Sequence, residues 1–273
     1  MEKLYPQDPF LRQYIDYYWV IDENNPAVKN GSMIFDFPSL SPELVIGLEG
    51  SFTYTYNNTT GAVNGATLFA FIEDKISIDI SGVKQVVIVR FQPNGLAAFA
   101  PFTSCDIPQL KRHAIVDAKP IVDASISKLE NSLDFTSSSN LIDQLDSWFK
   151  QQFKFNKGDF LADVCPDLDT SMSVQQLTAL TGVSYSTLER RFKFESGISP
   201  KQFLMLNRFR HVMVAINSHN DADWFDLVVD YGYHDQNHLI KEVKRFSGFT
   251  PTELMSLHRL KAYRPETAEE FLL

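Results

Sequence analysis

Two short segments of this sequence carry hydrogen-bonding and cationic side chains at the spacing of one helix face. Arg190 lies in the first segment, and its forked guanidinium can pair with the two acceptors of a guanine edge. Gln236 and Asn237 begin the second segment, and their amides match the donor and acceptor of an adenine edge. Lys241 lies one helical turn beyond Asn237, on the same face. This chemistry suits a surface that reads bases and holds phosphates, provided that helices position it.

The residues around the first segment predict a pair of helices joined by a tight turn. Ser173 precedes a helix that Gly182 ends, because serine caps a helix start and glycine adopts the left-handed conformation at a helix end. Ser184 then begins a second helix, which runs over 185–195 and ends at Gly197.

The second segment belongs to a pair of the same design. A helix over 224–231 ends at Gly232, and Asp235 caps a helix over 236–246 that ends at Gly248. The two turn glycines are 50 positions apart and the two caps are 51 apart. The two endings also match, as Gly-Ile-Ser-Pro over 197–200 and Gly-Phe-Thr-Pro over 248–251.

A long helix from Pro200 to about Asn217 is predicted to join the two pairs. Two helices angled by a short turn form the helix-turn-helix pattern, in which the second helix enters a DNA major groove. Eighteen residues span about 27 Å at 1.5 Å per residue, which is close to the ~34 Å repeat of one DNA face. The two second helices are therefore expected to enter successive major grooves of one duplex.

This pattern resembles the AraC/XylS family of transcription regulators over about 172–258. The most specific stretches are 182–193 with 197–200, and 232–239 with 244–251. The resemblance implies sequence-specific DNA binding, more often activation than repression, and no catalysis. The chain departs from the family at the residues after Pro251, where Tyr-Arg is usual, and at Leu239, Val243 and Val228, which keep their apolar character.

Nine residues of the two second helices are predicted to contact DNA. Arg190 and the two amides are expected to read bases, and the two lysines to hold phosphates. Each group has an alternative role: an ion pair for Arg190, helix capping for the amides, and packing under the turn for the histidine. The nine are Ser186, Thr187, Glu189, Arg190, Gln236, Asn237, His238, Lys241 and Lys244. Arg208, Arg210 and His211 lie on the connecting helix, and we interpret Arg210 in particular as part of a solvated face.

The first part of the chain has a β pattern. Strands are expected over 18–21, 33–37, 43–48, 51–56, 67–73, 76–80 and 84–91, with a turn at Asn57-Asn58 and a short helix from Leu96. Helices are expected around 119–133 and 139–153. The polar segment 156–170 is either a linker or a short helix over 158–164 followed by a loop. Residues 1–110 loosely resemble the β-rich regulatory domain of some AraC/XylS regulators.

The predicted fold class is therefore α+β, with a mostly antiparallel β domain followed by an all-α domain. We expect a sensor or dimerisation domain over 1–110, a helical connector over 111–171, a DNA-binding domain over 172–260 and an acidic tail over 261–273. The aromatic residues Tyr14, Tyr17, Tyr18, Trp19, Phe35 and Phe37 either line an effector pocket or form plain β core.

The charge is divided unevenly along the chain. The formal net charge is −9, which by itself argues against a polyanion as partner. However, residues 1–171 hold 13 Lys and Arg against 22 Asp and Glu, whereas residues 172–265 hold 12 against 9. The region with the helix pairs is mildly basic, so its DNA binding should depend on well-placed contacts more than on bulk attraction.

Other chemistry has little support in the sequence. Cys105 and Cys165 are far apart and are expected to be thiols rather than a disulfide. His234 and His238 have helical spacing but no third ligand nearby, and the motifs of nucleotide and acyl-transfer sites are absent. We therefore expect no metal, no cofactor and no enzyme activity.

The expected partner is double-stranded DNA, and the expected location is the cytoplasm, since no apolar signal region or membrane span is evident. The prediction of a transcription regulator leaves three further partners open. They are RNA polymerase, a small-molecule effector of the N-terminal domain and a second copy of the chain. Two alternatives also stay open: a small-molecule-binding or catalytic N-terminal domain that uses the helices as a platform, and an adaptor whose helical domain no longer binds DNA.

Overall fold

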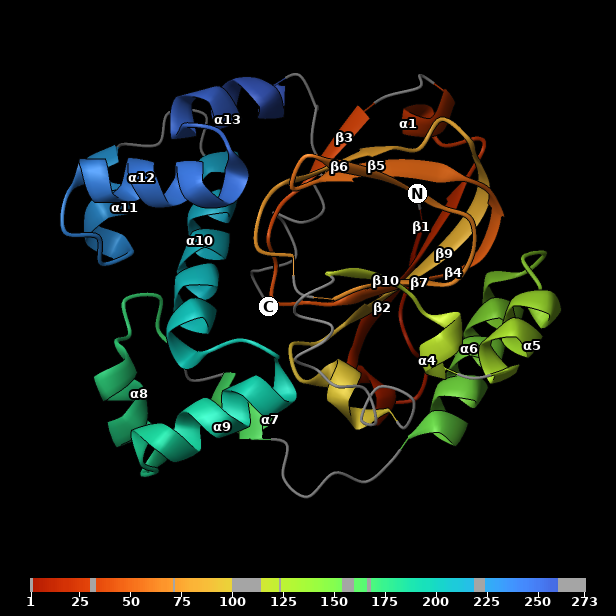
Figure 1. The fold of residues 1–273 in the computed structure, drawn as a ribbon, viewed down its shortest axis with the longest axis horizontal. Coiled ribbons are helices and arrows are strands. Elements are labelled where there is room, and N and C mark those ends of the chain that lie inside the picture. The colour runs from red at the N-terminus through yellow and green to blue at the C-terminus, as the bar shows by residue number, and fades with distance from the viewer. Residues whose placement is uncertain are drawn as a thin grey trace.

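The computed structural model describes residues 2–29, 33–70, 72–99, 114–122, 124–153, 160–165, 168–218 and 224–259. The fold class is α+β, as predicted, with an antiparallel β domain followed by helices (Figure 1). Within these residues, no helix combines the length and the apolar run that crossing a bilayer requires.

The β domain consists of two antiparallel sheets. Its strands are β1 (Glu2–Leu4), β2 (Ile15–Asp22), β3 (Met33–Asp36), β4 (Glu43–Gly50), β5 (Phe52–Tyr56), β6 (Thr59–Val63), β7 (Thr67–Phe69), β8 (Ile76–Asp79), β9 (Val83–Phe91) and β10 (Ile115–Asp117). Six strands form one sheet in the order β1-β2-β9-β4-β7-β10, and four form the other in the order β3-β8-β5-β6.

Most predicted strands are confirmed, and the differences lie at edges and turns. Asn57 and Asn58 have φ values of 49° and 60°, which a two-residue hairpin turn requires and asparagine tolerates. This turn joins β5 to β6. The predicted strand 67–73 is wrong beyond Phe69, and β1, β6 and β10 were not predicted. These are short strands or edge strands whose pairing partners are set by the fold rather than by a local pattern.

Both faces of the six-stranded sheet are buried. Tyr17, Trp19 and Ile21 on β2 pack in the core between the two sheets. Tyr18, between them in sequence, belongs to a second core that also includes Phe149 and other residues of the helices behind the sheet. A strand buried on both faces has a continuous apolar run instead of an alternating one, which explains the Tyr-Tyr-Trp-Val-Ile sequence.

The proposed aromatic effector pocket is not formed by the set that the sequence suggested. Tyr14, Tyr18 and Phe37 lie in one core, whereas Tyr17 and Trp19 lie in the other, on the opposite face of the sheet. Because successive side chains of a strand point to opposite faces, one cavity does not collect them all. The alternative interpretation, plain β core, is the correct one for this set.

The helices follow the predicted order. Their bounds are η1 (Leu11–Gln13), α1 (Pro26–Lys29), η2 (Gly95–Ala98), α4 (Lys119–Val122), α5 (Ala124–Ser132), α6 (Ser138–Gln152), α7 (Phe160–Val164), α8 (Val174–Thr181), α9 (Tyr185–Glu195), α10 (Pro200–Ser218), α11 (Trp224–Asp230), α12 (Gln236–Ser247) and α13 (Pro251–Arg259). The predicted helix 119–133 corresponds to α4 and α5, on either side of residue 123, which lies outside the described residues. The sequence missed α1, which is a single turn.

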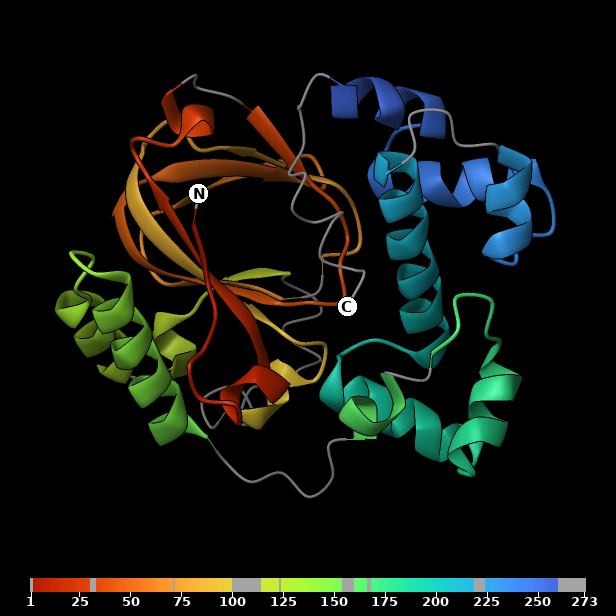
Figure 2. The ribbon, with the colours of Figure 1, turned by 180° about the vertical axis from the view of Figure 1, so that it is seen from behind.

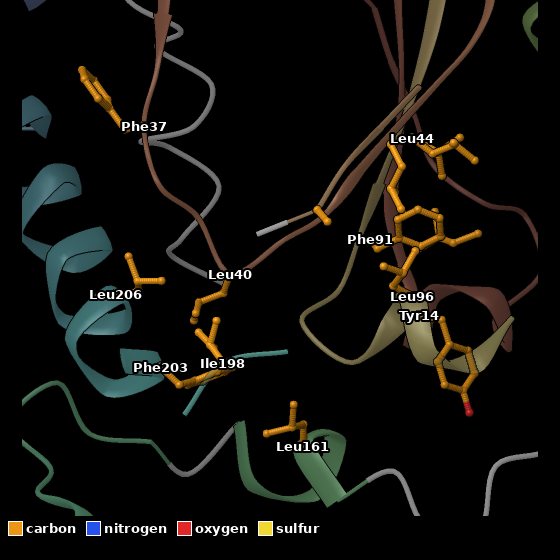
Figure 3. Close-up of a cluster of buried hydrophobic side chains, with 14 of the residues drawn as sticks. Tyr14, Phe37, Leu40, Leu44, Phe91, Leu96, Leu161, Ile198, Phe203 and Leu206 are labelled. Atoms are coloured by element: carbon orange, nitrogen blue, oxygen red, sulfur yellow. The ribbon is translucent and has the colours of Figure 1, made fainter. Parts of the chain in front are cut away.

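The long helix α10 runs from the first helix pair to the second, with the β domain along one side (Figures 1 and 2). The core behind the six-stranded sheet continues into the helical region without a break. Leu40, which follows β3 and precedes β4, lies beside Ile198 and Phe203 at the start of α10, and Leu206 is close to them (Figure 3). The two domains therefore share buried apolar surface.

Asp146 joins three parts of the β domain. This buried carboxylate on α6 accepts hydrogen bonds from the backbone N–H groups of Gln7 (2.9 Å) and Asp8 (3.0 Å) and from the hydroxyl of Tyr18 (2.7 Å). It fixes the N-terminal segment and β2 against the helix that covers the sheet.

Asp146→Ala should destabilise the β domain by about 3 kcal/mol, because it leaves buried donors without their acceptor. Urea denaturation followed by tryptophan fluorescence measures this loss. Asp143→Ala is the control, since Asp143 is exposed on the same helix and a surface change should stay within about 0.5 kcal/mol. Equal effects of the two substitutions would contradict the anchoring role of Asp146.

Candidate nucleic-acid interface

The predicted caps and turns that define the two helix pairs are confirmed. The Ser184 hydroxyl accepts a hydrogen bond from the N–H of Thr187 (3.3 Å), and the Asp235 carboxylate accepts one from the N–H of His238 (2.7 Å). Gly182 and Gly248 end their helices in the left-handed conformation, with φ values of 66° and 75°. A side chain would be strained at either position.

Helix α9 buries one face and exposes the other. Leu188 and Phe192 are fully buried in the helical core. Ser186, Arg190 and Lys193 are exposed, at the i, i+4 and i+7 positions of the opposite face. Helix α9 therefore presents a hydroxyl, a guanidinium and an ammonium along one line, from its first turn to its last.

Helix α12 has the same division. Leu239 and Val243 are fully buried, and Asn237, Lys241 and Lys244 are exposed at the same i, i+4 and i+7 spacing. Arg245, beside this line, is also exposed.

The exposed lines of the two helices are equivalent under the 51-residue offset of their caps. Ser186 corresponds to Asn237, Arg190 to Lys241 and Lys193 to Lys244. We call these two sets the outward triads. Lys193 was missed by the sequence analysis, although the offset from Lys244 identifies it.

The second helices of the two pairs, α9 and α12, are called the recognition helices below. Both present their N-terminal ends on the side away from the β domain (Figures 1 and 2). The N-terminal residues of such helices reach base edges in helix-turn-helix complexes. The β domain therefore leaves these ends accessible.

The remaining predicted residues are less directly outward. Thr187 is half-buried, and its hydroxyl is hydrogen-bonded to the Ser184 hydroxyl (3.1 Å). Glu189 forms an ion pair with Lys193 (2.7 Å), which places a carboxylate beside the first triad. Gln236 is exposed at the first position of α12.

His238 is exposed and also held by the turn. Its Nδ1 accepts a hydrogen bond from the N–H of His234 (3.4 Å), and its ring meets the edge of Tyr233 with centroids 5.2 Å apart. The two roles foreseen for this histidine, phosphate contact and packing at the turn, are therefore compatible. DNA contact by all nine residues stays a prediction.

A buried ion pair holds α12 on the connecting helix. Glu242 accepts hydrogen bonds from Arg208 Nε (2.9 Å) and Nη2 (2.6 Å) and from the Tyr233 hydroxyl (2.8 Å). Burial and then the Glu242 carboxylate raise the pKa of Tyr233. Partial burial works against the charge of Arg208, but the hydrogen bonds to Glu242 outweigh it and raise the Arg208 pKa. The Arg208 guanidinium therefore stays protonated and the Tyr233 hydroxyl stays neutral at neutral pH.

Helix α9 is held differently, through the segment that precedes the first helix pair. The buried Glu195 carboxylate accepts hydrogen bonds from the N–H groups of Phe160 (3.3 Å) and Leu161 (2.7 Å) at the start of α7. The Arg191 guanidinium lies 5.1 Å from the centroid of the Phe160 ring. The first recognition helix is thus attached to the chain that arrives from the β domain.

The interpretation of Arg210 as part of a solvated face is wrong. Burial, and then the neighbouring Arg90 of the β domain, lower the pKa of Arg210 to about 9. His211 is half-buried, and burial lowers its pKa. Arg210 lies near Arg90 and Asp16 of the β domain, whereas His211 lies beside Tyr231, with ring centroids 6.5 Å apart. The cover over α10 comes from distant parts of the chain, which a local pattern does not reveal.

The other candidate chemistry has no built site among the described residues. Burial raises the pKa of the Cys165 thiol to about 12, so this thiol is a poor nucleophile. Cys105 lies outside the described residues. No group of three or more His, Cys, Asp or Glu side chains in the described part of the chain is arranged to hold a metal ion.

Two family models match the chain. One, described as a helix-turn-helix domain, matches residues 177–256, which include both outward triads. The other, described as a domain of unknown function (DUF6597), matches residues 3–114. No curated protein matches the chain in sequence.

Solved structures of ToxT from Vibrio cholerae are similar to the chain at a low level. One has a TM-score of 0.45 and 10% identity, and covers 88% of this chain and 96% of that chain. Another, described as bound to an unsaturated fatty acid, has a TM-score of 0.42 and 9% identity, and covers 87% of this chain and 94% of that chain. Similarity at this level does not establish a shared activity.

Glu242→Gln should destabilise the helical domain by about 3 kcal/mol, because breaking a buried ion pair leaves the Arg208 charge uncompensated. Glu189→Gln makes the same change in the other recognition helix, at a more exposed ion pair that should contribute about 0.5 kcal/mol or less. Urea denaturation followed by circular dichroism compares the two. A loss at Glu242 no larger than that at Glu189 would show that the pair does not hold α12.

Proposed function

Because residues 177–256 form a helix-turn-helix DNA-binding domain of the AraC type, we propose that the chain binds specific DNA sequences and regulates transcription. Such domains belong to transcription regulators, a non-enzymatic family. The observation that supports the proposal most strongly is the pair of outward triads, which occupy equivalent positions on two capped helices.

The two recognition helices insert into successive major grooves of one duplex. Helix α10 has 19 residues, and at about 1.5 Å per residue it spans about 28 Å, close to one turn of DNA. The apolar faces of α9 and α12 are fixed in the core, so only their outward faces can enter the grooves.

The outward residues divide into two roles. Arg190, Asn237 and Gln236 read base edges, since forked guanidinium and amide groups match guanine and adenine. Lys193, Lys241 and Lys244 hold phosphates and set the position along the duplex. Ser186, Thr187 and His238 add hydrogen bonds at the groove edge, and Glu189 orients Lys193 and disfavours close phosphates.

The same proposal assigns a role to each part of the chain. Residues 1–110 form a sensor or dimerisation domain, 111–171 a helical connector, 172–260 the DNA-binding domain and 261–273 an acidic tail. The cavity between the two sheets of the β domain measures about 30 Å³, which is enough for about one water molecule. A small-molecule effector at that place would have to separate the sheets. The same proposal further predicts that the chain activates transcription through RNA polymerase and that it forms a homodimer.

Selection of bound fragments from a random DNA pool should yield one recurring motif with two half-sites about one helical turn apart. Affinity for the selected motif should fall steeply with salt, with a log–log slope near −0.9 for each phosphate contact. Filter binding or fluorescence anisotropy at several salt concentrations measures this slope. Binding without salt dependence, or a selection without a motif, would favour the adaptor alternative.

The Arg190→Ala and Lys244→Ala variants should affect DNA binding in different ways. Loss of Arg190 should cost about 1–3 kcal/mol on the selected sequence and relax the preference at one base pair. Loss of Lys244 should weaken all sequences about equally and reduce the salt slope by about 1. Competition binding against single-base variants of the motif separates the two outcomes. Identical profiles for both variants would contradict the division into readers and phosphate contacts.

A further inference from the structure

One short segment of the β domain contacts both helix pairs. This segment, 72–75, leads directly into β8. The Glu73 carboxylate accepts a hydrogen bond from the Gln202 amide nitrogen (3.2 Å), in the first turn of α10. The Lys75 ammonium lies 4.1 Å from the ring centroid of Phe249, between α12 and α13, and 4.8 Å from that of Phe35 on β3. The rings of Phe35 and Phe249 meet edge to face, with centroids 5.5 Å apart.

The two contact points lie in equivalent turns of the internal repeat. Gln202 belongs to the turn that ends the first pair, where its side chain accepts hydrogen bonds from the Ser199 N–H and hydroxyl. Glu253 accepts the same two hydrogen bonds from Thr250 in the turn that ends the second pair. We call these turns, 197–202 and 248–253, the two elbows. Glu73 contacts the first elbow, and Lys75 contacts the second.

The two helix pairs have no extensive contact with each other among the described residues. Helices α8 and α9 contact α10 at its start, and α12 and α13 contact α10 further along. Phe192 packs on Phe203, and Phe246 packs on Phe209, with centroids 5.1 Å apart in each case. Helix α10 is therefore their principal link within the DNA-binding domain.

The segment with Glu73 and Lys75 leads directly into a strand in the middle of a sheet. This strand, β8, pairs with β3 on one side and with β5 on the other. The β domain also packs on the start of α10 through Leu40, beside Ile198 and Phe203 (Figure 3). Contacts from the β domain to both elbows restrain the movement of one helix pair relative to the other.

We propose that Glu73 and Lys75 are positioning residues that brace the two elbows, so that the β domain sets the relative placement of the two recognition helices. With α10, the segment forms a second connection between the helix pairs. The consequence for DNA rests on the proposed function: the brace selects the separation between half-sites that the chain accepts. A change in the β domain that moves this segment then alters DNA binding without touching the recognition helices.

The double variant Glu73→Ala/Lys75→Ala tests the brace directly. Spin labels are attached to noncanonical amino acids that replace Ala179 on α8 and Asp226 on α11, which are both exposed. Pulsed electron paramagnetic resonance then measures the distance between the two helix pairs. Removal of the brace should broaden the distance distribution by about twofold, since the pairs then move about α10 alone. A distribution identical to that of the unsubstituted chain overturns the proposal, whether or not the chain binds DNA.

Two controls separate positioning from folding. Glu49→Ala/Lys84→Ala removes another exposed acid and base of the same domain, so it conserves net charge equally and should leave the distribution narrow. Lys75→Arg retains a cation for the two rings and should also leave it narrow. If the double variant does not fold, as judged by circular dichroism, Lys75→Gln replaces it in the same comparison. Broadening by the Glu49/Lys84 variant to the same degree would also overturn the proposal.

The DNA readout uses the motif found by selection, with the half-site separation changed one base pair at a time. The unsubstituted chain should lose about tenfold or more in affinity when the separation changes by two base pairs, because the second helix then faces a different edge of the duplex. The Glu73/Lys75 variant should lose only about threefold, since its helix pairs adjust. Equal losses would overturn the consequence for DNA, whereas a chain that binds no DNA would refute the proposed function and leave the distance measurement to decide the brace.

Discussion

Burial of α10 on several sides is the constraint on which the rest of the structure depends. Phe203, Phe209 and Val212 are almost fully buried, and apolar residues occur around the whole helix instead of along one stripe. A helix of this kind must be enclosed by other elements. The first helix pair, the second pair and the β domain each cover part of it. The same burial that stabilises the domain thus determines where both recognition helices lie. The placement of the outward triads follows from this core packing, to which the buried Glu242–Arg208 ion pair adds.

The sequence predicts the local design of the candidate interface well. Ser184 and Asp235 cap their helices as expected, and Gly182 and Gly248 end theirs, because capping depends on residues only three or four positions apart. The internal repeat also identifies positions that the local patterns do not. Lys193 follows from Lys244 by the offset of 51, and Gln202 follows from Glu253 in the same way. A repeat identifies equivalent positions even where one copy has a different residue.

Long-range packing could not be predicted in the same way. Arg210 has the local pattern of a solvated residue, yet the β domain covers it, and Arg90 is among the charges near it. Glu73 and Lys75 lie in a polar stretch that resembles any surface turn, and their partners are more than 120 positions away. The edge strand β10 similarly depends on a partner, β7, that lies well before it in the chain. Without an alignment or a repeat to relate distant positions, such contacts depend on the complete fold.

The unequal attachment of the two recognition helices implies an order of local opening. Glu242 joins α12 to α10 within one domain, so this part can remain intact while other parts open. Glu195 instead joins α9 to the start of α7, in the connector from the β domain. Separation of that connector exposes the Glu195 carboxylate and frees the first pair, whereas the second pair keeps its buried ion pair. We therefore expect the second pair to open less readily than the first, which amide hydrogen exchange would detect as two cooperative units.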